Sequence, residues 1–170
     1  MMDRDRPISH WWSQPVRRGP APAADATGME AALRLARAAA VREEVPVGAV
    51  VLQEGEILAE AHNETIQRND PTAHAELLAV QHALAAAKTD RLPGATLYVT
   101  LEPCAQCAGA IILAKVGRVV FGAYDQRAGM AGSVHDLLRD PRQNHRPEVI
   151  GGLMEEECQE LLLRFFRSRR

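Results

Sequence analysis

Two short clusters of metal-ligating side chains, far apart in the sequence, constrain the fold of this chain more than any other feature. His74-Ala75-Glu76 is followed, after 26 intervening residues, by Pro103-Cys104-Ala105-Gln106-Cys107. One imidazole and two thiolates are typical zinc ligands, and a set of three protein ligands leaves the fourth tetrahedral position open, as catalytic zinc sites do. Any fold that uses this set must bring residue 74 beside residues 104 and 107.

The spacing within each cluster suits the first turn of a helix. Cys104 and Cys107 stand at i and i+3, so both thiols face one side of a helix, and Pro103 is a residue that a helix opening tolerates. The positive end of the helix dipole favours thiolate over thiol. Glu76, two residues from His74, is predicted to accept and return the proton of a zinc-activated water, which requires an enclosed site that keeps its pKa from staying low.

Other interpretations of these residues remain open at this point. A C-x-x-C pair can be a redox dithiol, which would leave His74 and Glu76 without a role. It can also be half of a structural zinc site, which needs a fourth ligand. The third cysteine, Cys158, has no second C-x-x-C around it, and we predict a buried, unreactive thiol in a helix. The histidines that could supply a fourth ligand are His62, His82, His135 and His145.

Length and composition limit the class of protein. A chain of 170 residues suits one domain with a sizeable core. No apolar run approaches the ~18 residues of a membrane span, and the first six residues lack the apolar core of a secretory signal. We therefore expect a cytoplasmic protein without a membrane partner. The net charge of −2 gives no overall attraction to nucleic acid, so an RNA site would need a local basic patch.

Residues 1–27 are predicted to form a disordered extension, because they are rich in proline and show neither a helical nor a strand period. The pair Trp11-Trp12 lies in this segment, and docking onto the domain surface is its simplest account. A zinc-dependent domain is expected to follow at residues 28–170. Its first helix is predicted to begin at a capping box of Thr27 and Glu30.

The rest of the chain alternates between strand and helix patterns. A hairpin is expected from residues 47–52 and 57–61, with short strands at 97–100, 118–121 and 149–151. Helices are expected at residues 73–87, 104–115 and 155–167, with one or two helical turns at 134–138. This order predicts a sheet covered by helices.

Over about residues 29–170 the sequence resembles the bacterial tRNA-specific adenosine deaminases. The pattern H-x-E…P-C-x-x-C is the known signature of zinc-dependent nucleobase deaminases, and the similarity continues into the segments around it. The matching positions are Asn63 and residues 44–50, 70–76, 95–104, 117–123, 144–146 and 165–167.

The resemblance implies a three-layer α/β/α cytidine-deaminase-like fold with a central mixed five-stranded sheet. It implies a homodimer with one zinc per subunit, which deaminates adenosine to inosine at the wobble position of a tRNA anticodon, that of an arginine tRNA. The expected partner is the anticodon stem-loop, and DNA is not expected. His74, Cys104 and Cys107 would bind zinc, and Glu76 would shuttle protons.

Substrate contacts are also implied by the resemblance. Asn63 would hold the flipped nucleoside, Pro103 would lie against the substrate, and Asp125 would contact the RNA near it. Phe166 and Arg169 would meet neighbouring bases and phosphates. Because phenylalanine on a helix is more often core, one of Phe165 and Phe166 is expected to be buried and the other half-exposed.

Residues 113–115, Gln106 and Tyr124 depart from the family pattern, and two other functions stay open. Gln106 stands where the family often has methionine, and Tyr124 stands where a basic residue is common. A deaminase of free guanine, cytosine or a nucleoside would share the fold and the chemistry. A non-catalytic zinc module that binds RNA or a protein partner would share the metal ligands.

Overall fold

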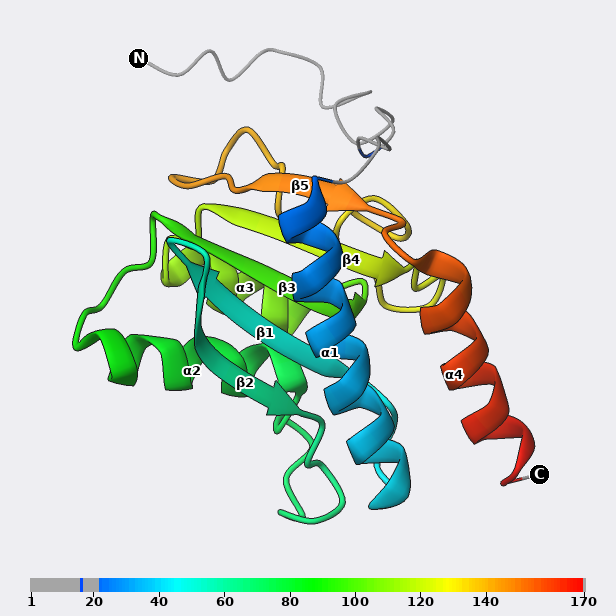
Figure 1. Cartoon of the computed structure of the whole chain (residues 1–170). Coiled ribbons are helices and arrows are strands. Elements are labelled where there is room, and N and C mark those ends of the chain that lie inside the picture. Colours follow the sequence, from blue (N-terminus) through cyan, green and yellow to red (C-terminus); the bar gives the residue numbers. More distant parts are fainter. Residues whose placement is uncertain (1–15, 17–21, 170) are drawn as a thin grey trace.

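A five-stranded mixed sheet forms the centre of the protein, with helices on both faces (Figure 1). The computed structural model describes Val16 and residues 22–169. The three-layer α/β/α architecture predicted from the sequence is confirmed. Along the chain the elements are α1 (Ala23–Val41), β1 (Gly48–Gln53), β2 (Glu56–His62), α2 (Ala75–Ala87), β3 (Ala95–Leu101), α3 (Ala105–Leu113), β4 (Arg118–Ala123), β5 (Glu148–Gly151) and α4 (Glu155–Arg167).

Strand direction places several candidate site residues at one edge of the sheet. The strand order is β2-β1-β3-β4-β5, in which β1 is antiparallel to both neighbours and β3, β4 and β5 are mutually parallel. The strands β2, β3 and β4 therefore all point the same way. Asn63, Pro103 and Asp125 follow the carboxyl ends of these three strands, which is the edge where open α/β sheets bind ligands.

Alternate strand residues build a separate core on each face of the sheet. One face packs against α1 and α4, which lie in front of the sheet in Figure 1. The other face packs against α2 and α3, behind it. The strand residues in the first core include Val50, Tyr98 and Val120, and those in the second include Ala49, Val51, Leu97, Val99, Val119 and Phe121.

The start of α1 differs from the sequence prediction. The helix begins at Ala23, and Thr27 lies inside it with its hydroxyl donating to the Ala23 carbonyl at 3.3 Å. The predicted capping box with Glu30 is therefore wrong. Within the predicted extension, residues 1–15 and 17–21, Trp11-Trp12 among them, lie outside the described part, and Val16 is buried.

A buried ion pair accounts for the earlier start of α1. Asp25 is 2% exposed and accepts two hydrogen bonds from the Arg118 guanidinium, at 2.5 and 2.7 Å. The hydroxyl of Tyr98 donates to the same carboxylate at 2.8 Å. These contacts join the first turn of α1 to β3 and β4, so the helix is extended by long-range contacts that local periodicity does not reveal.

Two other boundaries are shifted, and one predicted element is absent. His74 and Cys104 occupy the N-cap positions of α2 and α3, just before the first turns in which they were expected. Residues 134–138 form turns and a bridge between Ala131 and Asp136 in place of the predicted helical turns. The hairpin, the three later strands and α4 are present as predicted.

Cys158 packs tightly between α4 and the sheet. It is 1% exposed, and burial raises the pKa of its thiol to about 12. A Cβ atom at Gly122 would lie 2.3 Å from the Cys158 sulfur, so glycine is what allows α4 to approach β4 this closely. The predicted burial of this thiol is confirmed, and a raised pKa disfavours the reactive thiolate. In the described residues, none of the helices has the length and apolar character of a membrane span.

Replacing Asp25 with asparagine should lower the free energy of unfolding by roughly 3 kcal/mol at pH 7, because Arg118 would lose a buried partner. The Arg118 hydrogen bonds hold the pKa of Asp25 below its ordinary 3.8. A carboxyl with a lowered folded-state pKa adds stability above its unfolded pKa and loses it as the pH falls through the folded value.

The difference in the free energy of unfolding between wild type and the Asp25→Asn variant should therefore shrink as the pH is lowered below 3.8. Urea unfolding at a series of pH values measures it. Asp90→Asn is the matched control, because the Asp90 side chain is 87% exposed. An Asp25→Asn penalty that stays constant across the acid range would contradict the role of this ion pair.

Candidate active site

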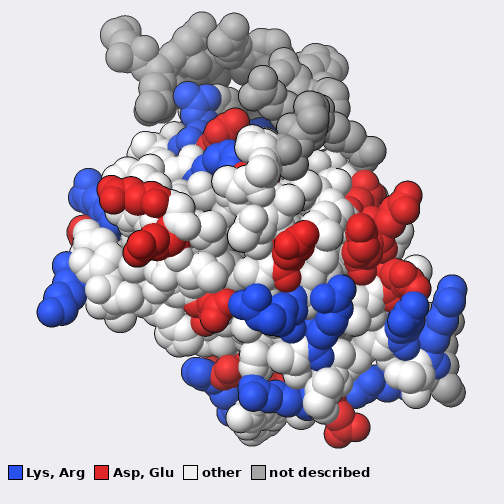
Figure 2. Space-filling model, viewed as in Figure 1, with Lys and Arg blue, Asp and Glu red and all other residues white. Residues whose placement is uncertain are grey.

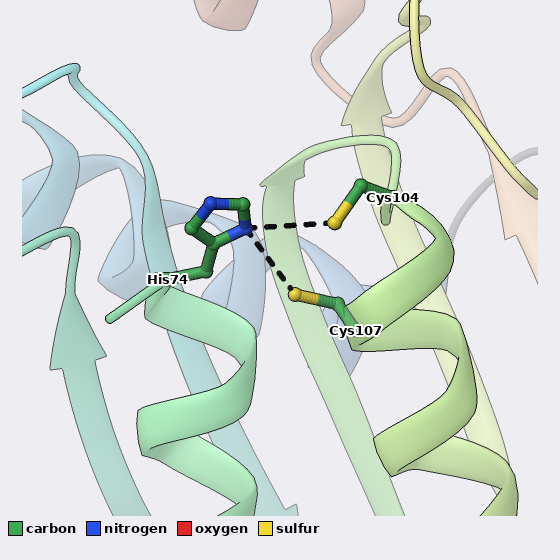
Figure 3. A group of neighbouring side chains, drawn as sticks. All are labelled: His74, Cys104 and Cys107. Carbon is green, nitrogen blue, oxygen red and sulfur yellow. Dashed lines mark hydrogen bonds between the residues drawn. The ribbon is translucent and has the colours of Figure 1, made fainter. Parts of the chain in front are cut away.

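The three predicted metal ligands converge from the starts of two helices. His74 precedes α2, Cys104 precedes α3, and Cys107 lies in the first turn of α3. The His74 Nδ1 atom is 3.5 Å from the Cys104 sulfur and 3.6 Å from the Cys107 sulfur. Figure 3 shows the imidazole and both thiols pointing toward one another.

This geometry fits zinc. With Zn–S and Zn–N bonds of about 2.3 and 2.05 Å and tetrahedral angles, a ligating nitrogen and sulfur lie about 3.6 Å apart. The two nitrogen–sulfur distances in the structure agree with that value. The zinc-binding role predicted for the three residues is thus supported by the distances as well as by the donor types.

Within the described residues, no fourth side chain joins the three ligands. Of the histidines that could have completed a structural site, His62 bonds to the Asn63 carbonyl and His145 to the Val116 carbonyl. A zinc bound here keeps one position open to water or substrate, which is the arrangement of catalytic sites.

The two thiols share a proton in an arrangement that favours one thiolate. Hydrogen bonds from Cys107 and His74 lower the pKa of the Cys104 thiol to about 4. The bond to Cys104, together with burial, raises the pKa of Cys107. A bound zinc would hold both sulfurs as thiolates, because the metal charge replaces the shared proton.

Glu76 lies in the first turn of α2 and is 5% exposed. Burial raises the pKa of its carboxyl to about 7. A carboxyl with that pKa takes up and releases a proton at little cost near neutral pH. The enclosed environment that a proton carrier needs is therefore present.

A hydrogen bond ties the two metal-binding segments together. The Gln106 side-chain amide donates to the Thr72 carbonyl at 2.9 Å, across from the first turn of α3 to the residues before His74. Thr72 is itself held by Asp70, whose carboxylate accepts from its backbone N–H and its hydroxyl at 2.8 and 2.7 Å. Gln106, which departs from the family pattern, thus helps to fix the distance between the ligands.

The Asn63 side chain is available to a ligand. Asn63 is 7% exposed, and its backbone N–H donates to the Val47 carbonyl at 3.0 Å. Its side-chain amide makes no hydrogen bond within the described residues. Every fully buried side-chain nitrogen or oxygen in those residues does have a partner. The amide of this largely buried residue must therefore reach solvent. Its role in holding the substrate stays a prediction.

Pro103 and Asp125 lie at the same edge of the sheet. Pro103 is buried, and its carbonyl accepts from the Met130 N–H at 2.9 Å. One carboxylate oxygen of Asp125 accepts from the backbone N–H groups of Arg127 and Ala128, at 2.9 and 3.2 Å. Asp125 thereby closes the turn in which it lies, and its predicted contact with RNA is not tested by this geometry.

The end of α4 shows the predicted division between its two phenylalanines. Phe165 is 7% exposed and Phe166 is 49% exposed. The guanidinium of Arg169 lies 3.7 Å from the centre of the Phe165 ring, and it donates to the Glu43 carbonyl at 3.3 Å. The end of α4 is thus attached to the segment that follows α1.

Two buried carboxylates to which the sequence analysis gave no role hold the loops beside the site. Glu44, which is 0% exposed, accepts from the backbone N–H groups of Ile66 and Gln67, at 2.9 and 2.7 Å. It thereby fixes the loop of residues 63–74. The available signal was an acidic residue directly before the apolar segment that leads into β1.

Glu102 does the same for the loop of residues 124–133. It is 1% exposed and accepts from the N–H groups of Asp125, Ala131 and Ser133, at 3.0, 2.9 and 3.1 Å. A Cβ atom at Gly129 would lie 2.4 Å from this carboxylate, so only glycine allows the loop to wrap so closely. These bonds replace the helical turns that were predicted at residues 134–138.

Changing either buried carboxylate to an amide should loosen only its own loop. A glutamine offers one acceptor oxygen, and its NH2 group faces backbone N–H groups that also donate. Glu102→Gln should therefore lower the free energy of unfolding by roughly 2 to 4 kcal/mol. Hydrogen exchange should rise at Ala131 and Ser133 and stay unchanged at Ile66 and Gln67. Glu44→Gln should give the reverse pattern, so each variant is the control for the other. Equal loosening of both loops by either variant would contradict these assignments.

Glu76 should make the stability of the metal-free protein depend on pH. Its folded-state pKa is raised from 4.5 to about 7, so the stability it contributes is complete below 4.5 and is lost as the pH rises through 7. With a chelator present, the free energy of unfolding of the Glu76→Gln variant should therefore rise by about 3 kcal/mol relative to wild type between pH 4.5 and 8. Denaturant unfolding at both pH values measures this difference, and a difference that does not change with pH would contradict the assignment.

Comparison with known proteins agrees with this geometry. Residues 22–123 match the family described as the cytidine and deoxycytidylate deaminase zinc-binding region. The tRNA-specific adenosine deaminase of Bacillus subtilis (strain 168) is 51% identical over 84% of this chain and 88% of its own. That of Agrobacterium fabrum is 46% identical over 84% of this chain and 93% of its own.

A solved structure gives the same result in three dimensions. It comes from work on A-to-I editing by tRNA:A34 deaminases at the wobble position, and it aligns with a TM-score of 0.77 at 45% identity. The alignment covers 80% of this chain and 99% of the other. With its zinc ligands, fold and sequence in agreement, this chain belongs to the zinc-binding cytidine and deoxycytidylate deaminase family and, within it, to the tRNA-specific adenosine deaminases.

Proposed function

We propose that this protein deaminates adenosine to inosine at the wobble position of a tRNA anticodon, with an arginine tRNA as the substrate that the family resemblance implies. The observation that carries the chemistry is the convergence of His74, Cys104 and Cys107 beside the buried carboxyl of Glu76. The substrate is supported by relatives named tRNA-specific adenosine deaminase that match most of the chain.

The side chains of the site divide the reaction between them. His74, Cys104 and Cys107 would hold a zinc ion, which would supply Lewis-acid activation of one water molecule. Glu76 accepts the proton that the water loses and returns it to N1 of adenine as the C6–O bond forms. Glu76 then takes the proton of the new C6 hydroxyl and delivers it to the 6-amino group, which leaves as ammonia as the C6=O bond forms, so that adenosine and water become inosine and ammonia. The Asn63 amide, which can both donate and accept, holds the nucleoside in place.

An RNA loop fits the distribution of charge over the surface. Exposed arginines gather over the second half of α1 and the end of α4, whereas the start of α4 is acidic (Figure 2). This basic patch supplies the local attraction to phosphate that the net charge of −2 does not. Its exposed members are Arg34, Arg37, Arg42, Arg164, Arg167 and Arg169.

The basic patch extends toward the edge of the sheet that carries the zinc ligands. The end of α1 leads into Val47, which bonds to Asn63, and Arg169 bonds to the carbonyl of Glu43. An anticodon loop can place one splayed base in the site at low unstacking cost while its phosphates meet the patch. We assign substrate contacts to Asn63, Pro103, Asp125, Phe166 and Arg169.

Several expectations from the sequence remain predictions. The homodimer, the cytoplasmic location and the absence of DNA binding rest on the family resemblance or on composition. A deaminase of free guanine, cytosine or a nucleoside would use the same ligands and the same glutamate, so the substrate must be decided by assay.

The deciding assay offers zinc-loaded protein an anticodon stem-loop with adenosine at the wobble position, beside free guanine, cytosine and adenosine. Inosine should form in the stem-loop, and the free compounds should stay unchanged. Turnover of a free base without turnover of the stem-loop would replace the proposed substrate. Sequencing inosine in cellular tRNA with and without the protein then tests the physiological role.

Variants of the site separate chemistry from metal binding. Glu76→Gln should lower the rate by at least about 10²-fold, because the proton carrier is lost, while metal analysis still finds one zinc per chain. Cys107→Ser should lose the zinc together with the activity. Glu157→Gln, at an exposed position of α4, is the control. Full activity in Glu76→Gln would favour a non-catalytic zinc module, and loss of its zinc would show that Glu76 is a ligand.

A further inference from the structure

We propose that Arg42 and His62 are positioning residues for Asn63: the Arg42 guanidinium fixes the neutral His62 ring in the one tautomer that can hold the Asn63 carbonyl. The proposal rests on the proposed function, in which Asn63 holds the target nucleoside. It assigns a purpose to two residues that lie outside the zinc site and its proton chemistry.

The His62 ring lies between a guanidinium and a carbonyl. His62 is the last residue of β2 and is 8% exposed. Its Nε2 atom is 2.6 Å from Nη1 of Arg42, the residue that caps the end of α1. Its Nδ1 atom is 2.8 Å from the backbone oxygen of Asn63.

These two partners permit only one protonation state of the ring. A guanidinium can only donate hydrogen bonds, so Nε2 must present its lone pair to Arg42. A carbonyl can only accept, so Nδ1 must carry the hydrogen. The contacts together select the neutral ring with its proton on Nδ1. Among the described residues, a further charged group near the ring is Glu64, at 4.0 Å from Nε2, and its carboxylate also pairs with Arg68.

The Nδ1–H bond completes the fixing of Asn63. The backbone N–H of Asn63 donates to the Val47 carbonyl at 3.0 Å, which holds the peptide group before its Cα atom. The His62 ring holds the peptide group after it. With both flanking peptide groups held, the direction in which the Asn63 side chain leaves the backbone is set, while its amide remains free for a ligand.

The hydrogen bonds of His62 act at the start of the 63–74 loop, where Asn63 lies. Asn63 begins the 63–74 loop, and Glu44 holds that loop only from Thr65 onward. Between the end of β2 and the part fixed by Glu44, the Glu64 N–H donates to the Ala73 carbonyl at 3.0 Å, and the Arg42–His62 pair holds the carbonyl side of the same peptide group. Arg42 also ties this point to the end of α1, where its charge complements the negative end of the helix dipole.

Two amide side chains test the proposal, because each reproduces one nitrogen of the ring. Asparagine at position 62 places an amide N–H near Nδ1, whereas glutamine places its polar end near Nε2. His62→Ala and His62→Gln should lower kcat/KM for the stem-loop by about tenfold or more, mainly through KM, since one hydrogen bond that positions a binding residue is lost. His62→Asn should recover most of that loss.

Controls distinguish positioning from a general structural role. Zinc content and the free energy of unfolding are measured for the same three variants. A merely structural histidine predicts that His62→Asn and His62→Gln lose activity and stability together and to a similar extent. That outcome, or a His62→Asn variant no better than His62→Ala, would overturn the proposal.

A nitrogen-15 NMR measurement on ring-labelled histidine tests the tautomer without any assay of activity. The hydrogen of His62 should lie on Nδ1 in the wild-type protein, spread between both nitrogens in Arg42→Ala, and return to Nδ1 in Arg42→Lys, which keeps a donor. A hydrogen on Nε2 in the wild type would overturn the proposal. A wild-type protein with the expected tautomer that forms no inosine would instead count against the proposed function alone.

Discussion

The common direction of β2, β3 and β4 is the constraint on which the rest of the site depends. A parallel pair such as β3 and β4 needs a crossover, and here the crossover is α3, which must begin where β3 ends. Because β2 points the same way, the chain leaves it at the same edge and enters α2 there. Two helix N-termini are thereby brought to one place. The ligands His74, Cys104 and Cys107 need only occupy the first positions of those helices to meet.

Burial has opposite consequences for the three glutamates around this edge. Glu44 and Glu102 are surrounded by backbone N–H groups, and each carboxylate fixes one loop by accepting hydrogen bonds from them. Glu76 meets instead the thiol of Cys107 and its own backbone N–H, which do not offset the loss of water, so its pKa rises to about 7. The same type of side chain thus anchors a loop where donors are plentiful and has a pKa near neutrality where they are few.

The sequence predicted the parts of the protein that depend on local pattern or on a fixed spacing. The hairpin, α4 and the metal ligands follow from alternation, helical period and the two motif clusters. It could not predict what depends on partners distant in the chain. The first turn of α1 is held by Arg118, 93 positions beyond Asp25, and the turns near residue 134 are shaped by Glu102. His62 was considered only as a spare ligand, because nothing local shows that Arg42 faces its ring.

The separation of charge along α4 has a consequence for how a substrate approaches. Three glutamates occupy its first turn, and Arg164 and Arg167 lie in its last. Each end complements the helix dipole, but together they also give this face of the molecule a lasting electrostatic gradient. A polyanion near the surface feels a torque as well as a pull, since one end of the helix repels it and the other attracts it. A protein with almost no net charge can in this way present a preferred orientation to its encounter partner, and that preference weakens as salt shortens the reach of the field.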